Sequence, residues 1–269
     1  MNTYRAFFGL QQDPFANDLS LKQIMKTPEL SAVENRFNYA LSLGGVAAIT
    51  GDIGSGKSTA VRYAQSQLHP SEYLSFHVIA TSGAILELYR QIASVLNIPK
   101  ITNSKALMTS MIRNEITNLV SSRKLKPVLI IDEASLLRLE VFAELHTLLQ
   151  FDQDAKHHLP LILVGQATVI DKLSFRTSAP LASRVITRCH LEGLSLSDMH
   201  QYICHHIRLC GIESNLFDES AITAVHQGSG GLLRKANHLA RGALIAAAKQ
   251  KSRQVLADHV QIASTELIQ

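Results

Sequence analysis

The sequence contains no tryptophan, and aromatic residues make up only 6% of its 269 residues. A platform of stacked aromatic side chains for single-stranded nucleic acid is therefore not expected. Its three cysteines, Cys189, Cys204 and Cys210, have neither the spacing of paired metal ligands nor that of a disulfide framework. No apolar run approaches the length of a membrane span, and residues 1–20 lack the basic start and long apolar segment of a signal peptide. We therefore expect a cytoplasmic protein with no membrane span.

The remaining composition is that of an ordinary globular protein. Hydrophobic residues make up 46% and charged residues 18% of the chain, and its length suits one large or two modest domains. The net charge of +4 is compatible with a polyanionic partner but does not require one. Charge alone therefore does not indicate the function.

The most informative stretch is residues 46–59, VAAITGDIGSGKST. An apolar run, Val46–Thr50, predicts a strand, and it is followed by the phosphate-binding pattern Gly-x4-Gly-Lys-Ser and a helix. Glycines allow backbone N–H groups to turn toward a phosphate, and the start of the helix adds its positive dipole end. We predict that Lys57 reaches the β- and γ-phosphates of ATP and that the Ser58 hydroxyl holds Mg²⁺. The predicted nucleotide-binding residues are Gly51, Asp52, Ile53, Gly54, Ser55, Gly56, Lys57, Ser58 and Thr59.

A second stretch, residues 127–134 (PVLIIDEA), ends an apolar run with two carboxylates. Consecutive apolar residues predict a strand buried on both faces of a parallel sheet, and such sheets bind ligands at the carboxyl ends of their strands. Asp132 would hold Mg²⁺, directly or through water, and Glu133 would polarise the water that attacks the γ-phosphate. The alternative, that both acids only cap the next helix, is less favoured because the phosphate-loop pattern lies upstream.

The rest of the chain predicts a domain boundary. Residues 73–80 and 159–165 read as further strands, and Gln166 stands at the tip of the second, where it could orient water or be an ordinary loop residue. We expect helices over 28–44, 84–96, 104–120 and 136–150, and from Ser195 onward helices alone. The predicted division is an irregular apolar arm and a helix packing on the core over 1–45, an αβα nucleotide-binding domain over 46–194 and a helical lid over 195–269. Packing explains the arm's phenylalanines, and a wall beside the adenine base is the alternative.

This order of motifs resembles the AAA+ ATPases. The fold implied is a three-layer αβα P-loop NTPase with a parallel sheet, followed by an all-helical lid. The segments FFGLQQDPF, LILVGQ and GSGGLLRKANHLARGAL look like one branch, which holds the ExeA-type secretion ATPases and the transposition regulators of the MuB, IstB, TniB and TnsC group. By position, Gln166 resembles sensor 1, although many members have Asn or Thr there. Arg234 resembles the lid arginine of sensor 2.

The resemblance also implies an arginine finger that enters a neighbouring subunit's site. Arg184 matches it best, with Arg176 and Arg188 close by. The implied catalytic residues are thus Glu133, Gln166, Arg184 and Arg234, in an Mg²⁺-dependent ATPase that forms a homo-oligomer, a ring or a helical filament, when ATP is bound.

Two functions are consistent with the resemblance. In the first, ATP drives assembly on double-stranded DNA without regard to sequence, and the assembly recruits or activates a transposase. In the second, the chain is an ExeA-like secretion ATPase that acts in envelope assembly. The first is favoured because the chain ends where the lid ends, and a metabolic kinase is disfavoured by the lid. Candidate DNA contacts are Lys100, Lys105, Arg113, Arg123, Lys124, Lys126 and Lys156.

Overall fold

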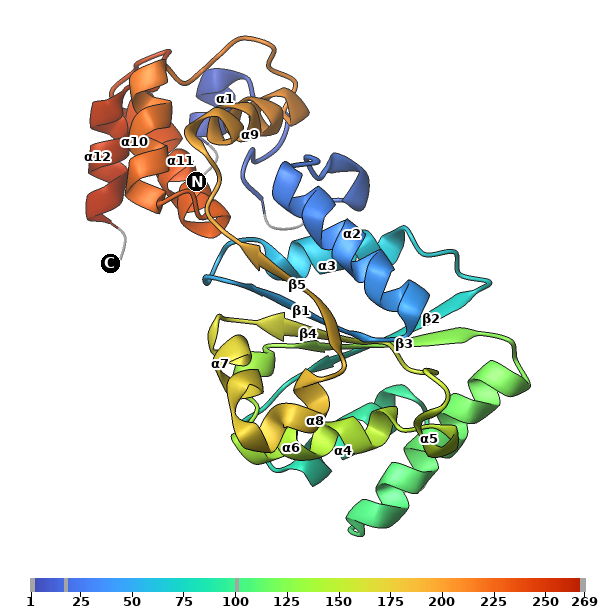
Figure 1. Cartoon of the computed structure of the whole chain (residues 1–269). Coiled ribbons are helices and arrows are strands. Elements are labelled where there is room, and N and C mark those ends of the chain that lie inside the picture. The colour runs from blue at the N-terminus through green and yellow to red at the C-terminus, as the bar shows by residue number, and fades with distance from the viewer. Residues whose placement is uncertain (1–2, 17–18, 100–101, 267–269) are drawn as a thin grey trace. The chain divides into compact units, whose positions relative to one another are not determined.

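The structure, a computed structural model, describes residues 3–16, 19–99 and 102–266 (Figure 1). The chain divides into two compact units. The sheet unit comprises Pro28–Gly51 and Lys57–Leu191. The helical unit comprises Met1–Thr27, Asp52–Gly56 and Glu192–Gln269. The sequence predicted that the chain is entirely helical from Ser195 onward, and the sheet unit ends a few residues earlier, at Leu191.

The sheet unit is built on a fully parallel five-stranded sheet with the order β2-β3-β4-β1-β5. The strands are β1 (Val46–Gly51), β2 (Tyr73–Ile79), β3 (Lys126–Asp132), β4 (Leu161–Gly165) and β5 (Val185–Leu191). The three central strands are almost wholly buried because their sequences are continuous apolar runs, as strands covered on both faces require. The edge strands β2 and β5 instead alternate between more and less exposed residues. The predicted parallel sheet is confirmed.

Helices cover both faces of this sheet, which gives three layers (Figure 1). On one face lie α2 (Pro28–Leu43) and α3 (Lys57–Ser66). On the other lie α4 (Ile85–Val95), α5 (Lys105–Ser121), α6 (Leu139–Leu145), α7 (Thr168–Ser174) and α8 (Ala179–Ala182). Apolar side chains from this second face form a continuous core with the sheet. The core fixes the strand ends at which the predicted site residues lie.

The prediction of a single helix over 136–150 is wrong. The segment forms two 3-10 helices, η2 (Ala134–Leu136) and η3 (His146–Leu149), with α6 between them. Arg138 has an extended backbone (φ −67°, ψ 155°), and its Nε donates to the carbonyl of Ser82 at 2.6 Å. This contact and the burial of Leu137 keep the backbone extended at Arg138, although the helical periodicity of the sequence predicts a continuous helix there.

The helical unit contains α9 (Leu196–Leu209), α10 (Glu219–Ser229), α11 (Leu233–Lys249) and α12 (Ala257–Thr265). Two of these helices begin where a side chain caps them: Ser195 accepts from the N–H of Asp198, and Asp218 accepts from the N–H of Ala221. α10 ends at Ser229, and the next residue, Gly230, has a φ of 60° that suits a left-handed cap. The predicted helical region after the sheet is confirmed.

The N-terminal arm departs from its predicted place. Residues up to Thr27 group with the helical unit, and only α2, from Pro28, groups with the sheet. The arm is also partly regular, since α1 (Thr3–Phe8) opens it. Phe8, Leu10 and Phe15 are buried in the hydrophobic core of the helical unit. The physical reason is the hydrophobic effect. The arm's phenylalanines pack on the apolar faces of α9, α10 and α11 and remove both surfaces from water.

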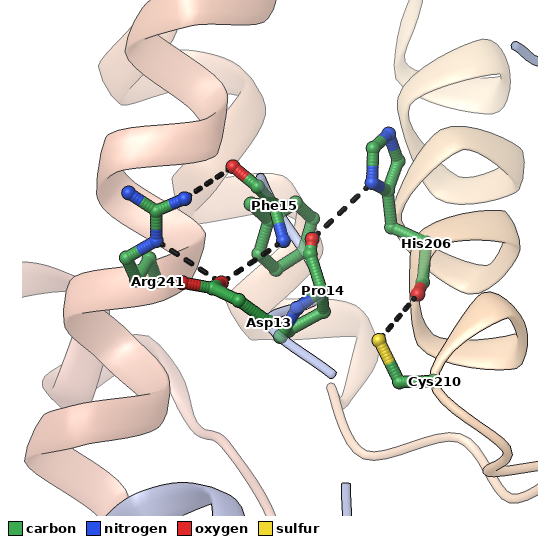
Figure 2. A network of polar contacts seen from close by, with 6 residues as sticks. All are labelled: Asp13, Pro14, Phe15, His206, Cys210 and Arg241. Carbon is green, nitrogen blue, oxygen red and sulfur yellow. Dashed lines mark hydrogen bonds and ion pairs between the residues drawn. The ribbon is translucent and has the colours of Figure 1, made fainter. Parts of the chain in front are cut away.

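Polar contacts fix the arm in that core (Figure 2). Arg241 of α11 donates from Nε to the Asp13 carboxylate at 3.2 Å and from its guanidinium to the carbonyl of Phe15. On the other side, His206 Nδ1 lies 3.3 Å from the carbonyl of Pro14, and its ring stacks on Phe15 with centroids 5.2 Å apart. The arm is therefore an integral layer of the helical unit.

Candidate nucleotide-binding site

The loop Asp52–Gly56 has the backbone that the phosphate-binding pattern predicts. Gly54 and Gly56 have φ angles of 86° and 95°, which side-chain-bearing residues rarely adopt. Ser55 is buried, and its hydroxyl has no hydrogen-bond partner among the described residues. A buried hydroxyl without a partner, between two such glycines, fits a loop that closes around a polar ligand such as a phosphate chain.

Lys57, Ser58 and Thr59 form the first turn of α3, directly after the loop. The Lys57 ammonium donates to the carbonyl of Gly51 at 2.9 Å, so its charge is held over the end of β1. Ser58 and Thr59 are exposed. These positions place a cation, two hydroxyls and the positive end of a helix together, which suits phosphate oxygens and a metal ion that binds them.

Asp132 and Glu133 stand at the carboxyl end of β3. Asp132 is the last residue of the strand, and its Oδ1 accepts from the N–H of Glu133 at 2.8 Å. Its other oxygen, Oδ2, lies 3.8 Å from His77 Nε2. Glu133 is exposed and has a left-handed backbone, with φ 53° and ψ 32°. The left-handed turn at Glu133 therefore follows the end of β3 directly, and the residue is open to solvent there.

The strand register brings the predicted site residues of the sheet unit to one edge. β4 lies between β1 and β3, with Thr50 opposite Gly165 and Ile131 opposite Leu163. Gln166, one residue beyond β4, therefore lies at the same end of the sheet as Gly51 on one side and Asp132 on the other. Its side chain is half-buried. The sheet thus places a polar amide between the end of the phosphate-loop strand and the acidic strand end.

Arg234 lies in the first turn of α11 and touches the phosphate loop within the helical unit. Its N–H donates to the carbonyl of Gly54 at 3.1 Å, and a Cβ on Gly54 would lie 2.8 Å from the Arg234 Cβ. The neighbouring Leu233 is equally close to Gly56, at 2.9 Å from a Cβ built there. Glycine is therefore needed in this loop for close approach of α11 as well as for its turn.

The arginine proposed as a trans finger has a partner in its own chain. Arg184, which precedes β5, forms an ion pair with Asp154 at 2.7 Å and is only 16% exposed. The hydrogen bond from Arg184 lowers the pKa of Asp154. Arg176 and Arg188 are exposed. Pairing with Asp154 orients Arg184, and a role in a neighbouring subunit would require that pair to open.

Two residues that no sequence motif indicated lie next to the acidic end of β3 and stabilise it. Lys172 of α7 donates from Nζ to the carbonyls of Ser135 and Leu137, at 2.6 Å each, and so fixes the loop that follows Glu133. His77 of β2 lies beside Asp132. Lys172 follows no motif spacing, so nothing in the sequence indicates it. The exposed position of His77 on an alternating strand was the one available signal.

Comparison with known proteins identifies the architecture. Residues 41–173 match the family model described as "AAA domain". Cdc6p from Pyrobaculum aerophilum superimposes with a TM-score of 0.71 at 15% identity, over 96% of this chain and 72% of that one. The chain thus has the same fold as Cdc6p, with an AAA domain over residues 41–173. The Aeropyrum pernix ORC2 protein, solved as ADPNP–ADP complexes, gives 0.69 at 16% identity, over 96% and 73% of the two chains. The Aeropyrum pernix ORC1 protein, solved in complex with DNA, gives 0.67 at 14%, over 94% and 68%.

One curated relative matches in sequence. General secretion pathway protein A of Aeromonas hydrophila is 28% identical over 267 residues, which are 98% of this chain and 48% of that protein. The chain thus spans about half the length of the curated relative it matches. The narrower assignment to the transposition regulators is not confirmed by these matches. Within the described residues, no helix is both long and apolar enough to cross a membrane.

Proposed function

We propose that the chain binds and hydrolyses ATP and that it assembles on double-stranded DNA as an ATP-dependent regulator of a transposase. The observation that carries the ATPase part is the strand register, which sets Gln166 between the end of β1 and the Asp132–Glu133 end of β3. An open parallel sheet binds its ligand at this edge. The glycine loop and the first turn of α3 adjoin the same edge through Gly51 and Lys57.

Each residue has a proposed role in hydrolysis. Lys57 binds the β- and γ-phosphates, and Glu133 polarises the attacking water, which Gln166 orients. Ser58 and Asp132 are the residues that we assign to Mg²⁺, an ion that neutralises charge on the phosphates when bound. Arg234 responds to the γ-phosphate through α11, whose first turn already contacts the loop at Gly54. Arg184 of a neighbouring subunit stabilises the charge that develops during transfer.

The DNA part rests on the positive charge of the chain and on a structural neighbour that is described in complex with DNA. The structure narrows the candidate contacts. Three of the predicted cations are in ion pairs: Lys105 with Glu144, Lys126 with Glu72 and Lys156 with Asp152. Arg113 lies over the Phe151 ring, 5.6 Å from its centroid, and Lys100 is outside the described residues.

Arg123 and Lys124 are the strongest remaining candidates. Both are exposed, they are adjacent at the end of α5, and neither has an ion-pair partner in the described part of the chain. Cations in this state contact phosphates without first breaking an ion pair. Several such weak contacts, repeated in each subunit of a ring or filament, would give strong overall binding despite the modest net charge.

Fluorescence anisotropy of a labelled duplex tests this proposal, with ATP, ADP or no nucleotide across a salt series. We expect ATP to raise the affinity and salt to weaken it steeply, as counterion release requires. Changing Arg123 and Lys124 to Gln should weaken binding and reduce the salt slope by about 1 for each phosphate that the variant no longer neutralises. Lys126→Gln is the matched control, because Lys126 already pairs with Glu72.

A second function is favoured by one observation. The curated relative that covers nearly the whole chain bears the name of a secretion-pathway protein. In this alternative the same ATPase acts in envelope assembly, and DNA is not its partner. Weak duplex binding that is indifferent to nucleotide would favour the secretion role and contradict the DNA proposal. A cytoplasmic location stays a prediction of the sequence.

A further inference from the structure

A hollow of about 610 Å³ lies between α2 and β5, within the sheet unit and apart from the nucleotide-binding edge. It is lined by Arg36, Tyr39, Val185, Ile186, Thr187 and Arg188. We propose that this hollow binds an extended acidic segment of a partner protein, which adds to the sheet as a strand beside β5. The proposal does not depend on the proposed function. Because Arg188 is also one of the alternatives for the trans finger, the test measures peptide binding and not ATP hydrolysis.

The first step of the argument is the free edge of β5. β5 is the last strand of the sheet, and among the described residues β1 is its one strand partner. Val46 pairs with Val185 and Ala47 with Thr187, so the register is irregular at Ile186, within the hollow, and it is regular from Thr187 to Leu191. The proposed pairing therefore starts at Thr187. A regular edge strand presents unpaired backbone N–H and C=O groups to the side away from its partner. An extended peptide can pair with such groups, as in β-strand addition.

The second step is the charge of the hollow. Two of its lining residues, Arg36 and Arg188, are arginines, and none of the described residues that line it is acidic. Both are exposed, and neither has an ion-pair partner within the residues that the structure describes. A guanidinium presents a planar fork of donors that matches a carboxylate. The hollow therefore favours an occupant with carboxylates, and a glutamate- or aspartate-bearing strand supplies them at alternate positions.

The third step excludes other occupants. A second copy paired through β5 would bring no carboxylate from that strand to the two arginines, because β5 (Val185–Leu191) contains no aspartate or glutamate. Nucleic acid could satisfy the arginines but has no amide backbone to pair with the strand edge. Tyr39, 49% exposed, and Ile186, 37% exposed, also give apolar area for uncharged side chains between the acids. An acidic peptide strand uses all three features together.

The test uses the full chain and a fluorescein-labelled heptapeptide of alternating glutamate and valine, followed by fluorescence anisotropy. We expect saturable binding that weakens by roughly 10-fold or more in Arg36→Glu and in Arg188→Glu, because each removes a charge-assisted contact and adds repulsion. Arg123→Glu, which changes an exposed arginine outside the hollow, should bind the peptide as the unchanged chain does. Thermal unfolding followed by circular dichroism would verify that each variant is folded.

Two further peptides separate strand pairing from charge. A lysine–valine heptapeptide should bind at least about 10-fold more weakly. A glutamate–valine peptide N-methylated at alternate residues, along the side that would face β5, should lose most of its affinity, because it cannot complete the ladder. Three results would overturn the proposal: no binding of the glutamate–valine peptide at millimolar concentration, equal binding of the N-methylated peptide, or displacement of the peptide by unlabelled duplex DNA at the hollow.

Discussion

Glu133 has a left-handed backbone conformation that costs a residue with a side chain about 1–2 kcal/mol relative to glycine-compatible geometry. Such strain at a site is retained where function needs the geometry. We predict that Glu133→Gly makes the protein more stable than Glu133→Gln by about 1 kcal/mol, while both variants lose ATP turnover. Urea unfolding of the two variants measures the difference. Equal stability of the pair would show that the turn stores no strain.

His206 gives a second prediction for single residues. It is 2% exposed, and burial, with a smaller contribution from His205, lowers its pKa to about 4. Unfolding returns it to about 6.5, so between these values the unfolded chain binds more protons. The contribution of His206 to the free energy of unfolding is therefore complete above pH 6.5. It decreases as the pH falls toward 4, by about 3 kcal/mol in total.

Urea unfolding of the helical unit between pH 4 and pH 7 measures that dependence. The variant His206→Gln keeps a polar group near the carbonyl of Pro14 but has no ionisable ring. We expect its stability to depend much less on pH over this range. An unchanged slope in the variant would mean that other groups cause the loss.

At the scale of elements, the clearest prediction concerns the contribution of the N-terminal arm to stability. Phe15 is 1% exposed and packs against His206 and Phe217. Phe15→Ala should destabilise the helical unit by about 3–5 kcal/mol, the usual cost of removing a buried aromatic ring. Phe175→Ala is the control, because Phe175 is 54% exposed and should cost little. Equal thermal stability of the two variants would contradict the place of the arm in the core.

The sequence predicted elements best where local patterns decide them. β1, β3 and β4 follow from their apolar runs, and two helices of the helical unit follow from the caps Ser195 and Asp218. Contacts between distant residues were not predictable. The break in the helix over 136–150 depends on Arg138 reaching Ser82, and the place of the arm depends on Arg241 reaching Asp13.

The same limit applies to the site. The phosphate loop, Asp132–Glu133 and Gln166 lie where their motifs predict, because a motif at a strand end needs only the sheet to form. The ion pair between Arg184 and Asp154 joins residues without a diagnostic spacing, and so do the contacts of Lys172. Their roles in catalysis stay predictions.

For the whole molecule, we predict that turnover needs a neighbouring subunit. Specific activity should rise with protein concentration, and Arg184→Ala should bind ATP yet be inactive, because a trans arginine is commonly worth about 10³-fold or more in rate. Mixing Arg184→Ala with Lys57→Ala should restore some activity at mixed interfaces. Asp154→Ala is the control: it removes the partner of Arg184 but keeps the guanidinium, so it should stay active.

The same mixing experiment can also show that a different arginine is the finger. If mixtures made with Arg176→Ala or Arg188→Ala recover activity while those with Arg184→Ala do not, one of these two exposed residues is the finger. Activity that is independent of protein concentration would contradict a trans finger altogether.

ATP binding and steady-state phosphate release, measured on Lys57→Ala and Glu133→Gln beside the unchanged chain, test the central claim most directly. Lys57→Ala should lose tight ATP binding, because the cation held over Gly51 is removed. Glu133→Gln should bind ATP as before and turn it over about 10²-fold more slowly or worse, the scale of a lost general base. Normal turnover in Glu133→Gln, or normal ATP binding in Lys57→Ala, would contradict the assignment of this sheet edge as an ATPase site.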